Sequence, residues 1–266
     1  MSNDNWGHAA RFGIFIVGAE AVPEAEWWAM VPQGVSVHAA RVTSTTPWAR
    51  WDADRQSVAL SPDLERGAMQ FAAMGLTAVV LAHSSSSVAG GAAWDDAVMR
   101  ALSERLGKET AVTTNGLDCV LALRHLAICR PFLVVPPWFG EATLQAAARY
   151  LEAHDLAPSG SLQSAPDAQW SGIAPQDLYA NRMHMAQRTD LLRDQIKRDC
   201  PTGADGVLIA GTGLRCVGII DELEQALGRP VVTANQASLW RCLSLAGIGT
   251  PVTGYGRLLD GERLAG

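Results

Sequence analysis

The sequence has few of the residues and patterns on which several common functions depend. Only five of its 266 residues are cysteine, and no two of them form a Cys-x-x-Cys pair. A zinc knuckle, a redox pair and a disulfide framework are therefore not predicted. No apolar run approaches the roughly 18 residues that span a bilayer, and the N-terminal residues lack the basic stretch of a secretory signal. We expect a cytoplasmic protein with free thiols.

Positive charge and metal-ligand patterns are also scarce. Asp and Glu number 27 against 21 Lys and Arg, and the net charge of −6 argues against a nucleic-acid partner. The sequence contains no His-Glu-x-x-His motif, so no metal site is predicted. Tyr and Phe are rare, at three and five residues against nine Trp. The hydrophobic share of 48% allows a packed core and excludes a disordered chain.

Short apolar runs alternate with amphipathic stretches along the chain, which predicts βαβ units and parallel sheets. The expected strands occupy residues 12–18, 35–42, 77–82, 110–114, 131–136, 206–210 and 230–234. The expected helices occupy residues 23–30, 62–74, 93–106, 117–127, 141–154, 176–199, 217–227 and 236–246. Two long stretches, 43–60 and 155–174, are expected to be irregular, and the second is rich in Ser, Pro, Gly and Ala.

A weak internal repeat indicates two similar halves. Residues 112–115 and 232–235 lie 120 positions apart, and each segment ends an apolar run before an expected helix. Upstream, an expected strand in each half ends in a loop of small residues, 83–87 and 211–215. Chance similarity is the alternative, but the shared order of elements favours duplication. The predicted fold class is α/β, with two pseudo-symmetric Rossmann-like parallel-sheet halves and an active-site cleft between them.

The two loops carry groups that suit a small anion. Backbone N–H groups and hydroxyls at a helix N-terminus bind a carboxylate or phosphate, and two facing loops would suit a dianion. The alternative is a pair of tight turns with good capping residues. Residues 211–216 nearly match the Gly-x-Gly-x-x-Gly motif, but Cys216 replaces the third glycine. An NAD-linked enzyme is therefore a weak alternative.

His83 and Glu20 are the candidate acid and base groups. His83 directly follows an expected strand and can exchange a proton near neutral pH; a structural histidine bonded to the loop backbone is the alternative. Glu20 follows the first expected strand and can approach the same edge, although a solvated carboxylate is the more common outcome. None of the five cysteines has the cationic surroundings that lower the pKa of a thiol.

Several segments resemble the maleate isomerase and arylmalonate decarboxylase family, which belongs to the aspartate/glutamate racemase superfamily. The most specific part of the resemblance is residues 211–247. The first half is similar at residues 24–26, in the loop 82–86 with two glycines behind it, and at 136–138. Together the similar segments cover most of residues 12–255.

The resemblance implies two Rossmann-like halves, a substrate between them and no cofactor. It also implies a cysteine in each strand-end loop of maleate isomerases and racemases, and only the second of these in arylmalonate decarboxylases. In this sequence His83 and Gly211 stand at those two positions. Glu20 stands where the family has an asparagine, and Trp138 where it has a tyrosine. Covalent thiol addition therefore has no evident nucleophile here.

We therefore expect a cofactor-independent isomerase or lyase of a small carboxylate-type metabolite, with non-cysteine acid/base chemistry. His83 would be the main acid or base, and Glu20 a second one or an anchor for a cationic substrate group. The residues expected to contact the substrate are Ser84, Ser85, Gly211, Thr212, Gly213 and Trp138. The loop residues would stabilise a carboxylate or a developing enolate, and Trp138 would form a wall. The alternative is a small-anion binding or regulatory protein that has lost catalysis.

The halves are expected to divide the chain unevenly. We assign residues 1–115 and 230–266 to the first half and residues 116–229 to the second, allowing the halves to exchange terminal segments. The expected partner is the small carboxylate substrate, without nucleic acid, membrane, metal or cofactor. A homo-oligomer is compatible with the resemblance, because family members are often oligomeric.

Overall fold

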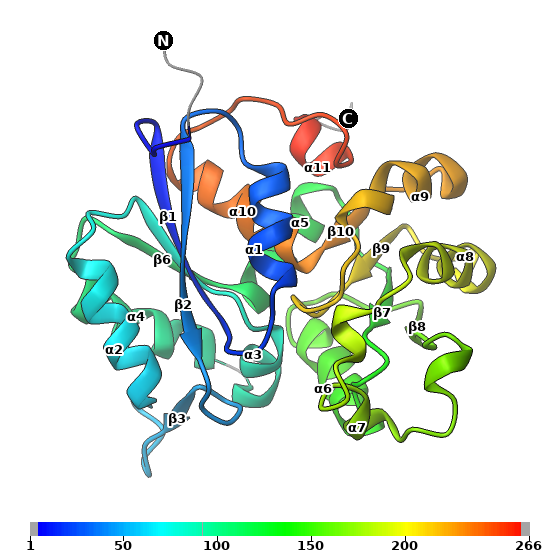
Figure 1. Ribbon diagram of the computed structural model, residues 1–266, viewed down its shortest axis with the longest axis horizontal. Coiled ribbons are helices and arrows are strands. Elements are labelled where there is room, and N and C mark those ends of the chain that lie inside the picture. The colour runs from blue at the N-terminus through cyan, green and yellow to red at the C-terminus, as the bar shows by residue number, and fades with distance from the viewer. Residues whose placement is uncertain (1–4, 92, 262–266) are drawn as a thin grey trace.

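Two four-stranded parallel sheets lie side by side at the centre of the molecule (Figure 1). The structure is a computed structural model and describes residues 5–91 and 93–261. The first sheet has the strand order β2-β1-β5-β6 and the second β10-β9-β7-β8. The strands of these sheets are β1 (Ala10–Val17), β2 (Val35–Val42), β5 (Ala78–Leu81), β6 (Ala111–Thr114), β7 (Pro131–Val135), β8 (Gly160–Gln163), β9 (Gly206–Ile209) and β10 (Val231–Thr233).

The two sheets have the same topology. Read from its other edge, the second sheet is β8-β7-β9-β10, which corresponds strand by strand to β2-β1-β5-β6. All neighbouring strands within each sheet run parallel. This common order confirms the predicted α/β class with two similar parallel-sheet halves, and it is the arrangement that the internal repeat predicted.

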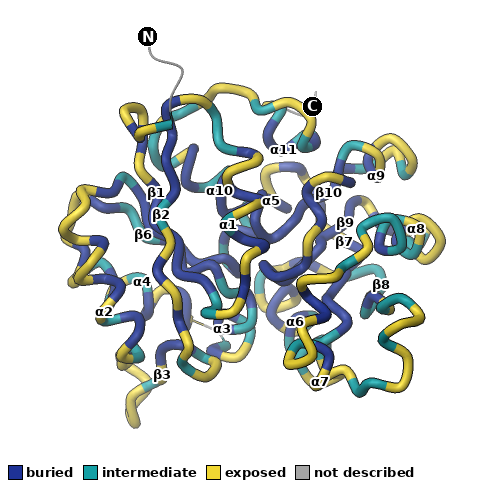
Figure 2. The backbone as a smooth tube through the Cα atoms, in the orientation of Figure 1, coloured by how far each residue is buried: buried dark blue, intermediate teal, exposed yellow. Residues whose placement is uncertain are grey.

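Helices cover both faces of each sheet, which keeps the strand backbones away from water (Figure 2). In β1, Phe12, Ile14 and Ile16 pack toward α1 and α10, whereas Phe15 packs toward α2 and α4. The helices are α1 (Val22–Met30), α2 (Pro62–Ala72), α3 (Ser84–Gly90), α4 (Trp94–Leu106), α5 (Asn115–His125), α6 (Glu141–Glu152), α7 (Pro175–Leu178), α8 (Thr189–Asp199), α9 (Ile220–Leu227), α10 (Ala234–Leu245) and α11 (Arg257–Asp260).

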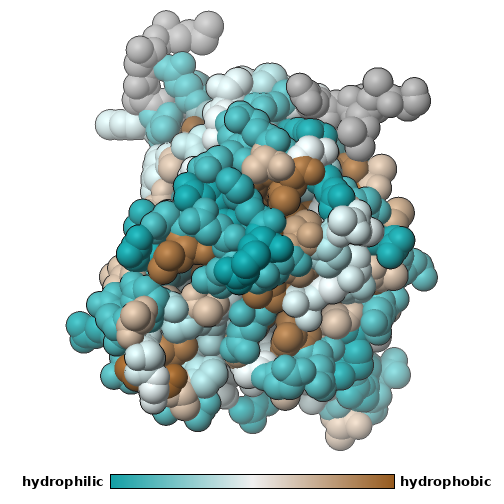
Figure 3. Space-filling view, turned by 90° about the vertical axis from the view of Figure 1, so that its right-hand side faces the viewer, coloured by the Kyte–Doolittle hydropathy of each residue, from teal (hydrophilic) through white to brown (hydrophobic). Residues whose placement is uncertain are grey.

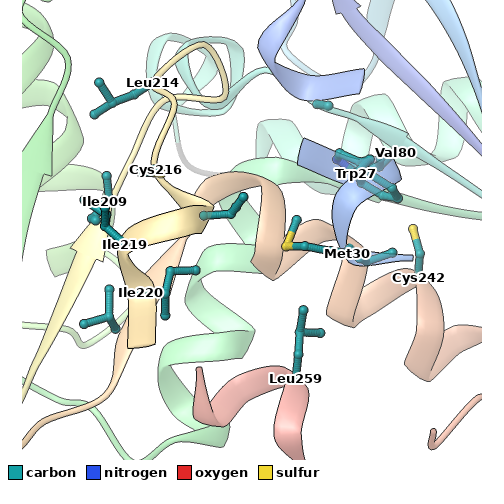
Figure 4. Packing of buried hydrophobic residues seen from close by; sticks show 14 of the residues in the cluster. Trp27, Met30, Val80, Ile209, Leu214, Cys216, Ile219, Ile220, Cys242 and Leu259 are labelled. Carbon is teal, nitrogen blue, oxygen red and sulfur yellow. The ribbon is translucent and has the colours of Figure 1, made fainter. Parts of the chain in front are cut away.

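One hydrophobic cluster extends across both halves. Figure 4 shows Trp27 and Met30 of α1 near Cys242 of α10, with Ile219 and Ile220 on the other side of the cluster. Trp27, Met30, Ile220 and Cys242 are completely buried. Burial of apolar surface contributes about 25 cal/mol per Å², so this shared cluster stabilises the two halves as one unit.

The halves exchange the helices that follow β6 and β10. β10 pairs with β9 in the second sheet, whereas α10, which follows it, contacts β5 and β6 of the first sheet. In turn α5, which follows β6, contacts β10. Of the segment 230–266 that we assigned to the first half, the strand β10 therefore belongs by pairing to the second sheet, and the chain crosses to the first sheet after it.

The buried amide of Asn115 holds this crossing in place. Its Nδ2 donates to the Ala234 carbonyl and to Ser238 Oγ, both at 2.8 Å, and both acceptors lie on α10. Its Oδ1 accepts from Ser84 Oγ at 2.5 Å. One side chain therefore joins α3, α5 and α10, which come from distant parts of the chain.

The predicted secondary structure is wrong in detail at five places. Two helices were not predicted: α3, which includes most of the expected loop 83–87, and α11. The stretch 43–60 contains a short antiparallel hairpin of β3 (Ala49–Trp51) and β4 (Val58–Leu60), and the stretch 155–174 contains β8. Strands of three or four residues are too short for a clear period-two pattern. The helix expected at 176–199 is broken into α7, a single 3₁₀ turn η2 (Met183–Met185) and α8. α7 ends at Leu178, and Arg182, whose φ of 64° is left-handed, is incompatible with a helix that continues through it.

The face that carries α8 and α9 is mostly hydrophilic, with hydrophobic residues in small separate patches (Figure 3).

Within residues 5–91 and 93–261, no helix has both the length and the apolar character needed to cross a bilayer.

Substitution of Asn115 tests the importance of the crossing. Asn115→Ala removes three buried hydrogen bonds and leaves their partners unsatisfied, so we expect it to lower the free energy of unfolding by about 3 kcal/mol. Asn181→Ala is the matched control, because Asn181 is exposed and donates a single bond to the Asp177 carbonyl; its expected effect is about 0.5 kcal/mol or less. Equilibrium urea unfolding measures both values, and equal small losses would contradict a central role for Asn115.

Candidate functional site

Two loops of small residues meet across a cavity of about 200 Å³. The first loop is the turn after β5 together with the first residues of α3, and the second follows β9. Both therefore lie at the carboxyl ends of sheet strands, where ligands of α/β proteins bind. Thr212 Oγ1 donates to the Ala82 carbonyl at 3.2 Å and joins the loops directly. All eight residues predicted for the site line this one cavity: Glu20, His83, Ser84, Ser85, Trp138, Gly211, Thr212 and Gly213. Val17, Phe139 and Tyr179 complete its lining.

Glu20 is a buried carboxyl group within this cavity. Glu20 lies in the turn after β1. The residue is only 5% exposed, so it is not the solvated carboxylate considered above. Desolvation raises the pKa of Glu20 to about 7, while the nearby Tyr179 and Thr212 side chains lower it in part. A β-carbon on Gly213 would lie against the Glu20 carboxyl, which would have to shift to make room for it. Glu20 therefore exchanges a proton near neutral pH.

His83 is held from two sides and is uncharged at neutral pH. Its Nδ1 lies 2.8 Å from Ser86 Oγ, and its ring stacks on Trp48 with centroids 4.1 Å apart and planes 12° apart. Burial lowers the pKa of His83 to about 3. Since its ring bonds a serine side chain, the alternative of a histidine bonded to the loop backbone does not describe it.

The cavity offers neutral hydrogen-bond donors for an anion. Within residues 5–91 and 93–261, the backbone N–H groups of Ser84, Ser85, Thr212 and Gly213 have no hydrogen-bond acceptor. No Lys or Arg is among the described residues that line the cavity. Oriented backbone N–H groups form anion-binding concavities without a formal positive charge. The arrangement fits a carboxylate or an enolate oxygen better than the alternative of two simple turns.

Tyr179 is a cavity residue that the sequence analysis missed. It was expected inside the helix 176–199, but the break after α7 turns its ring toward the site, where it meets the edge of Trp138 at 5.8 Å and stacks on His184 at 4.2 Å. A weak signal was present, because Asn181 favours bonding to nearby backbone over helix continuation. Its side chain bonds the Asp177 carbonyl at 2.9 Å. The sequence analysis also missed the fully buried Trp48, because it lies in the stretch 43–60 that was expected to be irregular.

Two polar atoms of the cavity are left for a bound molecule. Among the described residues, neither Glu20 Oε2 nor the Tyr179 hydroxyl has a hydrogen-bond partner of normal length and angle. Buried polar atoms are usually hydrogen-bonded. Both atoms are therefore candidates for contact with substrate.

The side chain of Glu26 accepts hydrogen bonds from backbone N–H groups that a dinucleotide would need for its pyrophosphate. Its Oε1 accepts from the backbone N–H groups of Cys216 and Val217 at 2.6 and 3.0 Å, and its Oε2 accepts from Asn235 Nδ2 at 2.7 Å. In a dinucleotide-binding loop, such N–H groups would hold the pyrophosphate. This buried carboxylate disfavours the NAD-linked alternative.

The cysteines lie away from the cavity. None of the five, all of which the structure describes, lines it. Burial raises the pKa values of four of them: Cys119, Cys200, Cys216 and Cys242. Thiolate chemistry at neutral pH is therefore disfavoured at these four residues. In the described part of the chain, no three His, Cys, Asp or Glu side chains group closely enough to hold a metal ion.

Known proteins resemble this chain along most of its length. The family profile described as arylmalonate decarboxylase matches residues 58–259. An arylmalonate decarboxylase of Bordetella bronchiseptica is 30% identical over 192 residues, which cover 70% of this chain and 72% of that protein. Among solved structures, a glycine-to-cysteine mutant of arylmalonate decarboxylase with sulfate has a TM-score of 0.73 and 26% identity, covering 94% of this chain and 99% of the other.

The fold is shared with a further group of enzymes. The maleate isomerase of Pseudomonas putida S16 has a TM-score of 0.78 at 17% identity, covering 95% of this chain and 98% of the other, so this likeness concerns the fold. The family-profile match over residues 58–259 and the 30% identity with the Bordetella enzyme are similarities of amino-acid sequence, and they show the family. This chain belongs to the arylmalonate decarboxylase family.

Proposed function

We propose that this protein is a cofactor-independent isomerase or lyase of a small carboxylate, and that Glu20, rather than a cysteine, transfers the proton. The observation that carries the proposal is the position of a buried carboxyl group, with a pKa of about 7, beside two loops of neutral anion donors. A group with a pKa near the working pH is suited to general acid/base catalysis. The role expected for His83 as the main acid or base passes to Glu20, because the pKa of His83 is about 3.

Substrate binding itself favours the protonated form of Glu20. A substrate carboxylate held by the N–H groups of Ser84, Ser85, Thr212 and Gly213 would place a negative charge in the same cavity as Glu20. Like charges disfavour each other's ionised forms, most strongly where water is excluded. Glu20 would then be neutral in the complex and ready to donate its proton.

Decarboxylation is the reaction that this single acid supports best. In a substrate with two carboxylates on one carbon, the bond to one carboxylate breaks and carbon dioxide leaves. The electron pair of that bond forms an enediolate with the remaining carboxylate, whose oxygens the loop N–H groups stabilise. Glu20 then protonates the carbon and regains its proton from water. Racemisation would need a second proton-transfer group on the opposite face, and uncharged His83 is a poor donor.

Turnover in D₂O tests the proposal. The purified protein would be incubated with aryl malonates, maleate, aspartate and cyclic amides, and the products followed by NMR. We expect carbon dioxide release from a malonate and one deuterium on the α-carbon of the product. Thermal stabilisation by these compounds without turnover would instead identify a small-anion binding protein and overturn the enzymatic proposal.

Removal of the Glu20 proton should abolish turnover. We expect Glu20→Gln to lower kcat by roughly 10²- to 10⁴-fold, because an amide cannot supply the proton, while the thermal shift with substrate remains. For the wild type, kcat/KM should be level at low pH and fall as pH rises through about 7, because the active form is the protonated one. Glu65→Gln is the control, since Glu65 pairs with Arg105 on the surface. Rising activity with pH would contradict a proton-donor role.

The hydroxyl of Tyr179 should set the position of this pH profile. The nearby Tyr179 hydroxyl favours ionised Glu20 and lowers its pKa. Tyr179→Phe should therefore raise the pKa of Glu20 and move the fall in kcat/KM to higher pH by about 0.5 to 1 pH unit. Tyr255→Phe is the matched control, because the Tyr255 hydroxyl donates to the Ala29 carbonyl instead. A shift toward lower pH, or an equal shift in both variants, would contradict this effect.

A further inference from the structure

Ser86 contacts His83 and does not itself line the cavity. Ser86 is completely buried on α3, and its Oγ lies 2.8 Å from His83 Nδ1. The backbone N–H of Trp48 donates to the same oxygen at 3.0 Å. Ser86 does not line the cavity, whereas His83 does. Three residues thus form a short chain of hydrogen bonds that ends at the catalytic cavity.

The hydrogen bonds of Ser86 determine which nitrogen of His83 carries the proton. Since Ser86 Oγ already accepts from Trp48, its own hydrogen needs an acceptor in a site closed to water. His83 Nδ1 is the acceptor that the described residues provide. If Nδ1 carried the proton instead, the Ser86 hydroxyl hydrogen would be buried without a partner, which costs about 1–3 kcal/mol. A neutral imidazole that accepts at Nδ1 must carry its proton at Nε2.

We propose that Ser86 is a positioning residue that holds His83 as the Nε2–H tautomer, so that His83 presents an uncharged N–H donor to the oxyanion of the bound substrate. Trp48 holds the plane of the ring by stacking on it at 4.1 Å. Nε2 makes no hydrogen bond within residues 5–91 and 93–261, so it is available to a ligand. The depressed pKa of His83 agrees with a ring that stays neutral throughout the reaction.

This role gives His83 a function that differs from proton transfer. An uncharged donor stabilises a developing enediolate oxygen without giving up its proton, as preorganised N–H groups of an oxyanion site do. It adds one side-chain donor to the backbone donors of the two loops. The oxyanion part of the inference rests on the proposed function, whereas the tautomer is a property of the ligand-free protein.

Ring-nitrogen NMR measures the tautomer without any turnover. Full-length protein labelled with ¹⁵N-histidine would be recorded at pH 7 in long-range ¹H–¹⁵N correlation spectra, with the His83 signals assigned by their loss in His83→Gln. We expect the wild type to carry its proton on Nε2. In Ser86→Ala the ratio of Nε2–H to Nδ1–H forms should fall about five- to tenfold, which corresponds to one hydrogen bond. Ser86→Thr retains the hydroxyl and should restore the ratio.

The wild-type spectrum alone is decisive if a variant fails to fold. A proton on Nδ1, or a doubly protonated ring at pH 7, would overturn the proposal. Trp48→Phe separates stacking from hydrogen bonding, since it keeps an aromatic ring and the backbone N–H that donates to Ser86. The Nε2–H form should persist in this variant, and its loss there would assign the tautomer to the indole rather than to Ser86.

Kinetics test the oxyanion contact. His83→Gln places an amide N–H near the position of Nε2, whereas His83→Asn places it near Nδ1, so we expect the first variant to retain more kcat. His83→Ala should lower kcat by about 10²- to 10³-fold, and Ser86→Ala should lower kcat with little change in KM. Equal activity of the Gln and Asn variants would overturn the oxyanion contact while leaving the proposed function intact. If no substrate is turned over, the proposed function and the oxyanion contact both fail, and the wild-type spectrum still decides the role of Ser86.

Discussion

Hydrogen bonds from two buried asparagines determine how the halves of this molecule face each other. Asn115 joins Ser84 in the first loop to α10, and Asn235 donates to the carbonyl of Thr212 in the second loop at 2.9 Å. Both asparagines lie at the start of a helix that follows the last strand of a sheet. Because these bonds are shielded from water, breaking them leaves buried groups unsatisfied. The separation of the two loops, and hence the shape of the cavity, depends on these contacts.

The electrostatics of the cavity follow from this closed arrangement. The lining residues that the structure describes offer N–H and hydroxyl donors but no Lys or Arg. In that environment desolvation acts on the two titratable groups in opposite ways, since it raises the pKa of Glu20 and lowers that of His83. Both groups are thus driven toward their neutral forms. A neutral Glu20 and a neutral His83 beside the unpaired N–H groups agree with the enediolate chemistry that we propose.

Much of the site could be predicted from the sequence because it lies at strand ends. Apolar runs located the strands, and the small residues that follow two of them located both loops, with Glu20 and Trp138 after two others. The contribution of Tyr179 could not be predicted in the same way. Amphipathic periodicity reports which face of a helix is buried, but it does not report that α7 ends at Leu178 or that Arg182 adopts a left-handed φ. Nor does the sequence reveal that Trp48 stacks on His83, since these residues meet only through the folding of the hairpin.

Four properties were predicted from the sequence alone: the α/β class, the repeat of two parallel-sheet units, the two small-residue loops and the absence of cysteine at the positions that the family resemblance assigns to thiols. These properties follow from periodicity and residue identity, which are local. The tertiary structure was needed to show which titratable group has a pKa near neutrality. A pKa depends on the solvent that neighbours exclude and on the bonds they offer, and the neighbours of Glu20 include Tyr179 and Thr212, more than 150 positions away in the chain. The sequence therefore predicted which residues line the cavity, and folding set the pKa values of Glu20 and His83.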